Sequence, residues 1–202
     1  MVECTSYPGY FELPTLLQTT GLQSNRNTTC HVCDASTLAY GCRGYLRMVG
    51  GGGQIHCVFI RGLARLCPKI PITVPRLELV AAVAAAELAR AIVLELEYNI
   101  GEVFFYTDST TVLHFINNRA QRFKTFVANR VNFIHLLSKP FQWGHVLSTE
   151  NPADIASRGL FPEDISKAKL WFEGPSFLKG ANRPPLSLPL LENRAALEAE
   201  LK

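Results

Sequence analysis

The sequence lacks a long apolar run and a secretory leader. No stretch reaches the roughly 18 uninterrupted apolar residues of a membrane helix, so we expect no membrane span and no membrane partner. The first residues carry Glu3, Pro8 and Glu12 instead of a basic start and an apolar run, which argues against a secretory signal. We therefore expect an intracellular protein, cytoplasmic or nuclear, whose six cysteines are reduced thiols.

A second close pair of metal-ligating residues is also missing. Cys30 and Cys33 have the spacing of half a structural zinc site, but such a site needs four ligands. Cys57 and Cys67 are far apart along the chain, and His56 stands alone. We expect Cys30 and Cys33 to be small apolar residues of a strand, with a zinc site as the alternative.

Charged residues are few and internal repeats are absent. Hydrophobic residues make up 48% of the chain and charged residues 18%, which is typical of a globular protein and excludes general disorder. The formal net charge of +3 permits a nucleic-acid partner without indicating one, because the indicative feature is a clustered basic face. The 202 residues are enough for one sizeable core with tails.

The order of elements predicts a mixed α/β sheet. Residues 1–29, rich in Pro, Gly and polar side chains, are expected to be irregular. Strands are predicted at His31–Asp34, Ala39–Val49, Ile55–Leu66, Glu102–Thr107 and Phe141–Leu147. Helices are predicted at Arg76–Leu96 after Pro75, from the cap Ser109 to Ile116, at Arg122–Leu137, and from the cap Asn151 to Gly159. An antiparallel meander followed by strands that alternate with helices gives such a sheet.

Four acids stand where the chain holds a side chain rigidly: Asp34, Glu78, Asp108 and Asp154. Asp34 and Asp108 end apolar strands, while Glu78 and Asp154 fall in first helical turns, where the ionised form is favoured by up to about 1 kcal/mol. If the four meet, their repulsion favours Mg²⁺, which prefers hard oxygen ligands. Two such ions about 4 Å apart can clamp both oxygens of a phosphodiester displacement. Spacing alone leaves the alternative open that each acid is a cap or a surface charge.

Five segments in this order resemble the RNase H region of BEL/Pao-type LTR retrotransposon polyproteins: CDASTLAYG (Cys33–Gly41), ITVPRLEL (Ile72–Leu79), FYTDSTTVL (Phe105–Leu113), RFKTFVANRV (Arg122–Val131) and ENPADIASRGL (Glu150–Leu160). LWFEGPSFL (Leu170–Leu178) resembles the element that follows on the way to the integrase. The resemblance implies an RNase H-like mixed five-stranded sheet with helices on both faces. The domain would span residues 30–160, and residues 161–202 would form a C-terminal extension towards an integrase region.

The resemblance also implies an activity. It implies an endonuclease that hydrolyses the RNA strand of RNA–DNA hybrids by two-metal-ion catalysis, removing template RNA after reverse transcription. The family's acidic positions fall on Asp34, Glu78, Asp108 and Asp154, which would be catalytic and would hold two Mg²⁺ ions, with Mn²⁺ as the alternative. The chain would then be a piece of a longer polyprotein, with reverse transcriptase and integrase regions as further partners.

Contacts with a hybrid can be predicted from residues near these acids. Ser36, Ser109 and Thr110 could reach 2′-hydroxyls across a shallow minor groove. Basic side chains around Arg122–Leu137, among them Arg122, Lys124 and Arg130, could contact phosphates, with a solvated helix face as the alternative.

Some residues depart from the family pattern. Arg43 and Gly44 stand where small apolar residues are expected, so we expect a weakened strand. No Tyr-x-Asp-Asp motif is present, so residues 1–29 do not resemble a reverse transcriptase. These departures favour the main alternative, a catalytically inactive structural or nucleic-acid-binding remnant. A 3′–5′ exonuclease is less favoured, because Ser36 stands where such enzymes usually have Glu. His145 is expected to be a hydrogen-bonded strand residue, with a catalytic role as the alternative.

Overall fold

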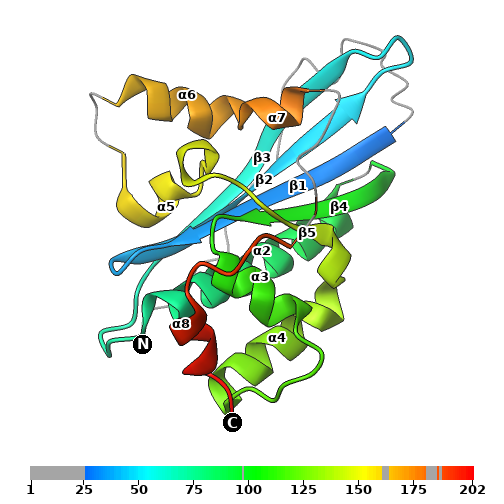
Figure 1. Ribbon diagram of the computed structural model, residues 1–202. Helices are drawn as coiled ribbons and strands as arrows, with labels where there is room; N and C mark the ends of the chain where they lie inside the picture. The colour runs from blue at the N-terminus through cyan, green and yellow to red at the C-terminus, as the bar shows by residue number, and fades with distance from the viewer. Residues whose placement is uncertain (1–25, 97, 161–163, 181–185, 187) are drawn as a thin grey trace, which may run out of the picture.

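One five-stranded mixed sheet organises the chain. A computed structural model describes residues 26–96, 98–160, 164–180, 186 and 188–202 (Figure 1). The strands are β1 (Arg26–Ala35), β2 (Ala39–Val49), β3 (Ile55–Leu66), β4 (Ile100–Thr107) and β5 (Trp143–His145). They lie in the order β3-β2-β1-β4-β5. The first three form an antiparallel meander, whereas β4 pairs parallel with β1, and β5 parallel with β4.

The strand predictions are confirmed for β2 and β3, whose bounds are as expected. β1 begins earlier, because the β-branched Thr28 and Thr29 continue the ladder and pair with both β2 and β4. Residues 26–29, which we expected to be irregular, are therefore part of the central strand, and residues 1–25 lie outside the described residues. β5 is shorter than the predicted Phe141–Leu147, since one 3₁₀ turn (Pro140–Gln142) precedes it and another (Ser148–Glu150) follows it.

The helices are α2 (Val74–Glu95), α3 (Thr110–Asn117), α4 (Thr125–Leu137), α5 (Asp154–Arg158), α6 (Ile165–Glu173), α7 (Ser176–Lys179) and α8 (Arg194–Glu198). Pro75 lies in the first turn of α2, as predicted. Ser109 caps α3 as predicted, because its hydroxyl accepts a hydrogen bond from the Val112 amide at 3.2 Å. No described helix is both long enough and apolar enough to cross a membrane.

The start of α5 differs from the prediction. The helix begins at Asp154, three residues after Asn151. Asn151 still makes the local bond of a cap, since its Oδ1 accepts from the Ala153 amide at 3.0 Å, while its buried Nδ2 donates to the Cys33 carbonyl at 3.1 Å. Gly159 ends α5 with a φ of 90°, a left-handed conformation that favours glycine, as predicted. The loop before α5 is therefore held by a local bond and by a long-range bond to β1.

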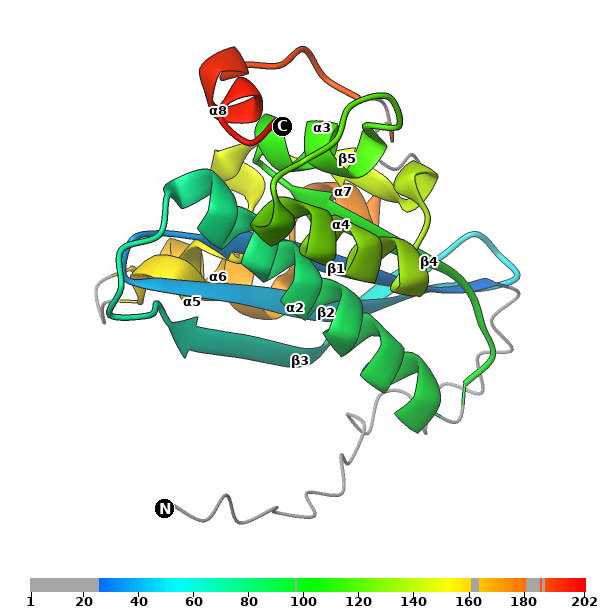
Figure 2. The ribbon, with the colours of Figure 1, turned by 90° about the horizontal axis from the view of Figure 1, so that it is seen from below.

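Helices cover both faces of the sheet, as predicted (Figures 1 and 2). α2, α3 and α4 lie on one face, and α5, α6 and α7 lie on the other. Successive residues of β4 serve the two cores alternately: Phe105 packs on the α2 side, and Phe104 and Tyr106 pack on the opposite side. This double burial explains the continuous apolar run of β4. Cys30 and Cys33 are buried on opposite faces of the sheet, as expected for apolar strand residues.

β2 continues through Arg43 and Gly44, but its pairing with β3 shifts register between Gly44 and Tyr45, so the expected weakness takes the form of a local irregularity. The Arg43 side chain is fully buried, with its guanidinium carbon 3.8 Å from the Phe59 ring centre and 3.5 Å from that of Trp171. Burial lowers the pKa of Arg43 to about 10, and the two rings compensate the cation through their π faces. A Cβ at Gly44 would lie 2.7 Å from Ile92 Cδ1, so glycine lets α2 approach the sheet closely.

Gly41 sets how closely α5 approaches the sheet. It pairs with Asp34 across the β1–β2 ladder. A Cβ at Gly41 would overlap the Ala156 side chain of α5 and would lie 2.6 Å from the Leu63 carbonyl oxygen. This glycine therefore positions the helix that carries Asp154.

We predict that Gly41→Ala displaces α5 and lowers the free energy of unfolding by about 1–3 kcal/mol, because backbone must move to admit the methyl group. The control is Gly62→Ala on β3, where a Cβ would meet the Trp171 ring at an ordinary 3.4 Å. Urea unfolding of both variants measures the difference. Equal stabilities of the two variants would contradict this packing.

Candidate functional site

The register between β1 and β4 brings two carboxylates together. Cys33 pairs with Thr107 in the parallel ladder, so Asp34 and Asp108 follow at the same edge of the sheet on neighbouring strands. Neighbouring strands are about 4.8 Å apart. Two of the predicted acids are therefore side by side for a topological reason.

The other two acids come from helices on opposite faces of the sheet. Glu78 lies near the start of α2, and the Ser109 hydroxyl, next to Asp108, donates to its carboxylate at 2.6 Å. Asp154 opens α5, and Ser157 of the same helix donates to the Asp34 carboxylate. Helices from both faces thus bring their N-terminal turns to the edge where Asp34 and Asp108 lie.

Burial and mutual repulsion raise the pKa of two of these carboxyl groups. The pKa of Asp34 rises to about 6, first through burial and then through the charges of Asp108 and Asp154. The pKa of Glu78 rises to about 7, first through burial, with further contributions from Asp108 and Asp34. Hydrogen bonds from Ser157 and Ser109 oppose these shifts. Asp34 therefore lies within electrostatic reach of Asp108 and Asp154, and Glu78 within reach of Asp108 and Asp34.

Each carboxylate nevertheless has its own partner. Besides the serine bonds to Asp34 and Glu78, the Ser148 hydroxyl donates to Asp108 at 2.7 Å. The Arg158 Nε lies 2.5 Å from the Asp154 carboxylate, and it also interacts with the charges of Asp34 and Asp108. In the described part of the chain, no three His, Cys, Asp or Glu side chains are arranged so as to hold one metal ion. The acids are therefore neighbours whose oxygens point to hydroxyls and a guanidinium rather than to a common point.

The donor set suits a hard divalent cation. Carboxylate oxygens are the ligands that Mg²⁺ prefers, and a cation would relieve the repulsion that raises the pKa of Asp34 and Glu78. Serine hydroxyls and an exposed arginine can release a carboxylate by side-chain rotation. Asp34 and Asp108, fixed on adjacent strands, are the side chains best placed to share an ion.

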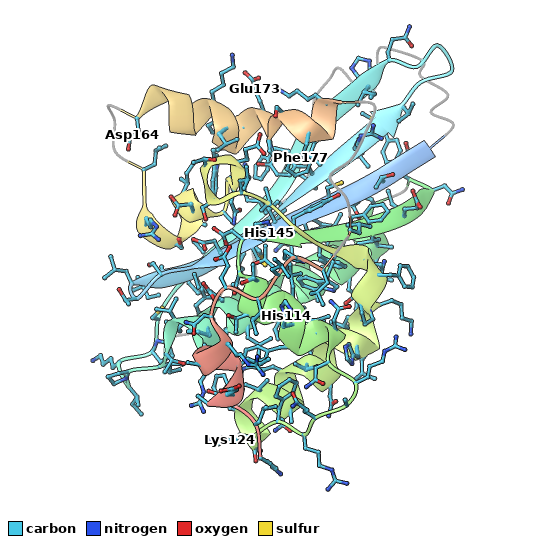
Figure 3. All side chains as sticks on the ribbon, in the orientation of Figure 1. His114, Lys124, His145, Asp164, Glu173 and Phe177 are labelled. Atoms are coloured by element: carbon cyan, nitrogen blue, oxygen red, sulfur yellow. The ribbon has the colours of Figure 1, made fainter. Side chains whose placement is uncertain are left out.

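His145 lies closer to this site than its place in a strand indicated. Its Nε2 is 3.2 Å from the Asp108 carbonyl oxygen, and it pairs with Thr107 across β4 and β5. Figure 3 labels it near the centre of the molecule, where β4 meets β5. The expected hydrogen bond is present, and its acceptor is the backbone of a site residue.

The three hydroxyls that we predicted to contact a hybrid are used within the chain. The Ser36 hydroxyl donates to the Ser157 carbonyl at 2.6 Å and so connects the β1–β2 turn to α5. Ser109 caps α3 and donates to Glu78, and Thr110 accepts from the Glu192 amide at 3.3 Å. All three residues are buried, so a contact with a hybrid would require them to give up these bonds.

The three basic residues predicted to contact phosphates lie around the start of α4. Arg122 lines a cavity of about 640 Å³ together with Arg119, Lys139 and Lys202. The Lys124 Nζ donates to the Ala199 carbonyl at 2.7 Å, and Arg130 lies 3.4 Å above the Phe126 ring. Sequence reasoning missed Ser148 and Ser157, whose bonds to Asp108 and Asp34 join distant segments, and it missed Arg158, which pairs with Asp154 one turn earlier in α5.

A family model matches part of the chain. Residues 13–109 match the family model described as the Pao retrotransposon-like RNaseH-like domain, a segment that contains Asp34, Glu78 and Asp108. The predicted resemblance is confirmed, and the sheet order and the helices on both faces are those of the predicted fold class. A search of curated proteins found no match.

Several solved RNase H structures are similar to the chain. RNase H1 from the halophilic archaeon Halobacterium salinarum NRC-1 is 15% identical, with a TM-score of 0.40, over 63% of this chain and 90% of that one. The N-terminal RNase H domain of rv2228c from Mycobacterium tuberculosis is 12% identical, with a TM-score of 0.44, over 71% and 96%. LC11-RNase H1 in complex with an RNA/DNA hybrid is 11% identical, with a TM-score of 0.41, over 64% and 91%.

We predict that the metal-free protein loses stability as the pH rises from about 4 to about 7. The pKa of Asp34 and Glu78 is higher in the folded than in the unfolded chain. The folded state therefore binds more protons in this window, and the free energy of unfolding falls across it. Mg²⁺ binds ionised carboxylates, so it should raise Tm near pH 8 and have little effect near pH 4.

Thermal unfolding in EDTA and in excess Mg²⁺ measures both effects, with Asp34→Asn as the comparison because it removes one like charge. The variant should be more stable than the wild type in EDTA near pH 8, and its Tm should respond less to Mg²⁺. A wild type that gains stability relative to Asp34→Asn over the same pH window would contradict the assigned shift.

We also predict that the positive charge of Arg158 partly offsets the repulsion among the acids when no metal is bound. Arg158→Met keeps the side-chain stem but removes the cation beside Asp154, so Tm in EDTA should fall and the rise in Tm on adding Mg²⁺ should increase. The control is Arg194→Met, whose partner Glu198 lies on α8 in a comparable i,i+4 pair. An Mg²⁺ response of Arg158→Met equal to that of the control would rule out this role.

Proposed function

We propose, from the Pao retrotransposon-like RNaseH-like family that residues 13–109 match, that this protein cleaves the RNA strand of RNA–DNA hybrids. The single observation that supports it best is the nearness of Asp34 at the end of β1 to Asp108 directly after β4, with Glu78 of α2 and Asp154 of α5 beside them at the same edge of the sheet. Within its element, this activity would remove template RNA after reverse transcription, beside reverse transcriptase and integrase regions of a longer polyprotein.

The residues present fit a pair of Mg²⁺ ions. Asp34 and Asp108 would hold them from the sheet, with Glu78 and Asp154 completing the set from α2 and α5. When bound, such ions activate the attacking water and stabilise the leaving oxygen of the phosphodiester. Hydrolysis adds water across the P–O3′ bond and leaves a 5′-phosphate and a 3′-hydroxyl.

The surrounding residues have supporting roles in this proposal. Ser109 and Ser157 orient Glu78 and Asp34 until the carboxylates turn to the ions. His145 holds the Asp108 backbone at the edge of the sheet. Basic residues around α4, among them Arg122 and Lys124, would contact the phosphates of the hybrid without reading its sequence.

One observation favours the second candidate, an inactive nucleic-acid-binding remnant. Each acid already has a hydroxyl or guanidinium partner, and no three of the described side chains converge as a metal site. The first candidate nevertheless accounts better for four acids held in repulsion in a partly buried place, which a purely structural role does not require. An exonuclease is disfavoured because such enzymes usually have Glu two residues after the first acid. Here that position is Ser36, whose side chain is buried.

The test is cleavage of a labelled RNA–DNA hybrid with Mg²⁺, beside single strands and duplex DNA. We predict cutting of the hybrid alone, and a fall of at least about 100-fold in Asp108→Asn, since even outer-shell partners of metal ligands contribute about 10- to 100-fold. Glu87→Gln, an exposed change on α2, is the matched control and should keep wild-type activity. Hybrid binding without cutting would support the remnant, and trimming of DNA ends would support an exonuclease.

A further inference from the structure

The last residues of the chain return to the side of the molecule that carries the acids. We define the C-terminal strap as residues 191–202, which include α8. The Glu192 amide donates to Thr110, two residues beyond Asp108. Leu201 forms an antiparallel bridge with Phe123, with amide bonds from Lys124 to Glu200 (2.7 Å) and from Lys202 to Arg122 (2.9 Å). Figure 1 shows this red segment beside α3 and the start of α4.

A buried carboxylate fastens the strap. Glu200 is only 5% exposed, and its two oxygens accept from Arg76 Nε at 2.7 Å and Nη2 at 2.9 Å. Arg76 and Glu78 both lie in the first turns of α2, so the pair lies at the same end of this helix as one of the proposed metal ligands. A bidentate bond between a guanidinium and a carboxylate is among the stronger polar contacts in proteins.

The surface under the strap is cationic. Arg76 and Arg130 both lie over the Phe126 ring, 5.0 Å and 3.4 Å from its centre, and burial, followed by the charge of Arg76, lowers the pKa of Arg130. Lys124 donates its Nζ to a strap carbonyl, and Figure 3 shows it beside α8. Arg76 and Lys124 therefore donate to a carboxylate and a carbonyl of the strap, which are acceptors like the oxygens of a phosphodiester, whereas Arg130 donates to the Phe126 carbonyl of its own helix at 3.0 Å.

The strap covers little apolar surface for the number of polar contacts that it makes. Leu197 and Leu201 are its contributions to the core, and both are only partly buried. Its other anchors are the Glu200–Arg76 pair and the bonds described above. The phosphates of a polyanion could accept from Arg76 and Lys124 in place of the strap, while the Arg122 carbonyl, an acceptor itself, would be left to water. Release would therefore leave the main core on the α2 side of the sheet largely in place.

We propose that the C-terminal strap is a cis-acting competitor that occupies the surface of Arg76, Lys124 and Arg130 and is displaced when an RNA–DNA hybrid binds there. This inference rests on the proposed function, because it assumes that the hybrid crosses the edge of the sheet where the acids lie. Glu200 takes the place of a phosphate at Arg76. Arg76 is accordingly a hybrid-binding residue that is masked in the free protein.

The experiment uses the full chain, in EDTA so that the hybrid is not cut. Glu200→Gln removes the charge that pairs with Arg76, and we expect hybrid affinity at low salt to rise by at least about fivefold, a typical lower size for coupled binding. The newly available arginine should also make the plot of log affinity against log salt steeper by about one. Glu198→Gln, whose partner Arg194 lies on the same exposed helix, is the control and should change neither quantity.

A second measurement on the unmodified chain does not depend on how the variant folds. Hydrogen exchange at the Lys124 and Lys202 amides, which pair across the strap, should accelerate when hybrid is added. The proposal that the strap is displaced would be overturned if these amides stayed as protected or became more protected on adding hybrid. It would also be overturned if a folded Glu200→Gln variant kept the wild-type hybrid affinity and salt slope. Hybrid binding with either of these results would leave the proposed function standing, whereas no hybrid binding by any form of the chain would count against the proposed function itself.

Discussion

The parallel pairing of β1 with β4 is the constraint on which the rest of the site depends. It places Asp34 and Asp108 at one edge of the sheet whatever else the chain does. Two like charges held close together and partly buried are unfavourable, which is visible in the raised pKa of Asp34. When no metal is bound, hydrogen bonds from Ser148 and Ser157 and the cation of Arg158 partly offset this repulsion. These residues have this role because the strand register brings the acids together, which local sequence does not reveal.

The two helices that complete the site can approach the sheet closely because they pack against glycines of β2, which have no side chain. Gly44 allows α2 to pack against β2 at Ile92, and Gly41 allows α5 to pack at Ala156. Arg43 and Gly44, which we expected to weaken β2, therefore each allow a packing contact. The glycine admits α2 on one face, while the arginine, held between aromatic rings, fastens β2 to β3 and α6 on the other.

Local patterns were sufficient to predict most of the fold. The β2–β3 hairpin, the doubly buried run of β4 and the Ser109 cap each depend on neighbours in sequence, and each is confirmed. Asn151 makes the local bond to the Ala153 amide that its sequence position indicated, but its second bond, to the Cys33 carbonyl, has a partner that only the folded sheet supplies, and α5 begins later than predicted. Arg43 could not be interpreted from sequence for the same reason, since Trp171 reaches it from α6. The four acids could be proposed from their residue type and from their positions at the ends of strands and helices. The hydroxyls that donate hydrogen bonds to three of them could not.

In the free protein, two of its own side chains occupy places that the metal ions and a phosphate would take in the proposed complex with a hybrid. Arg158 stands beside the acids where the proposed reaction needs metal cations, and Glu200 stands on Arg76 where it needs a phosphate. The Arg158–Asp154 pair is exposed, and exposed ion pairs are individually weak. The Glu200–Arg76 pair is bidentate and its carboxylate is buried, so its displacement requires a ligand that offers Arg76 comparable acceptors, as the phosphates of a hybrid do. Opposite charges therefore stand beside the acids and beside Arg76 both before and after binding.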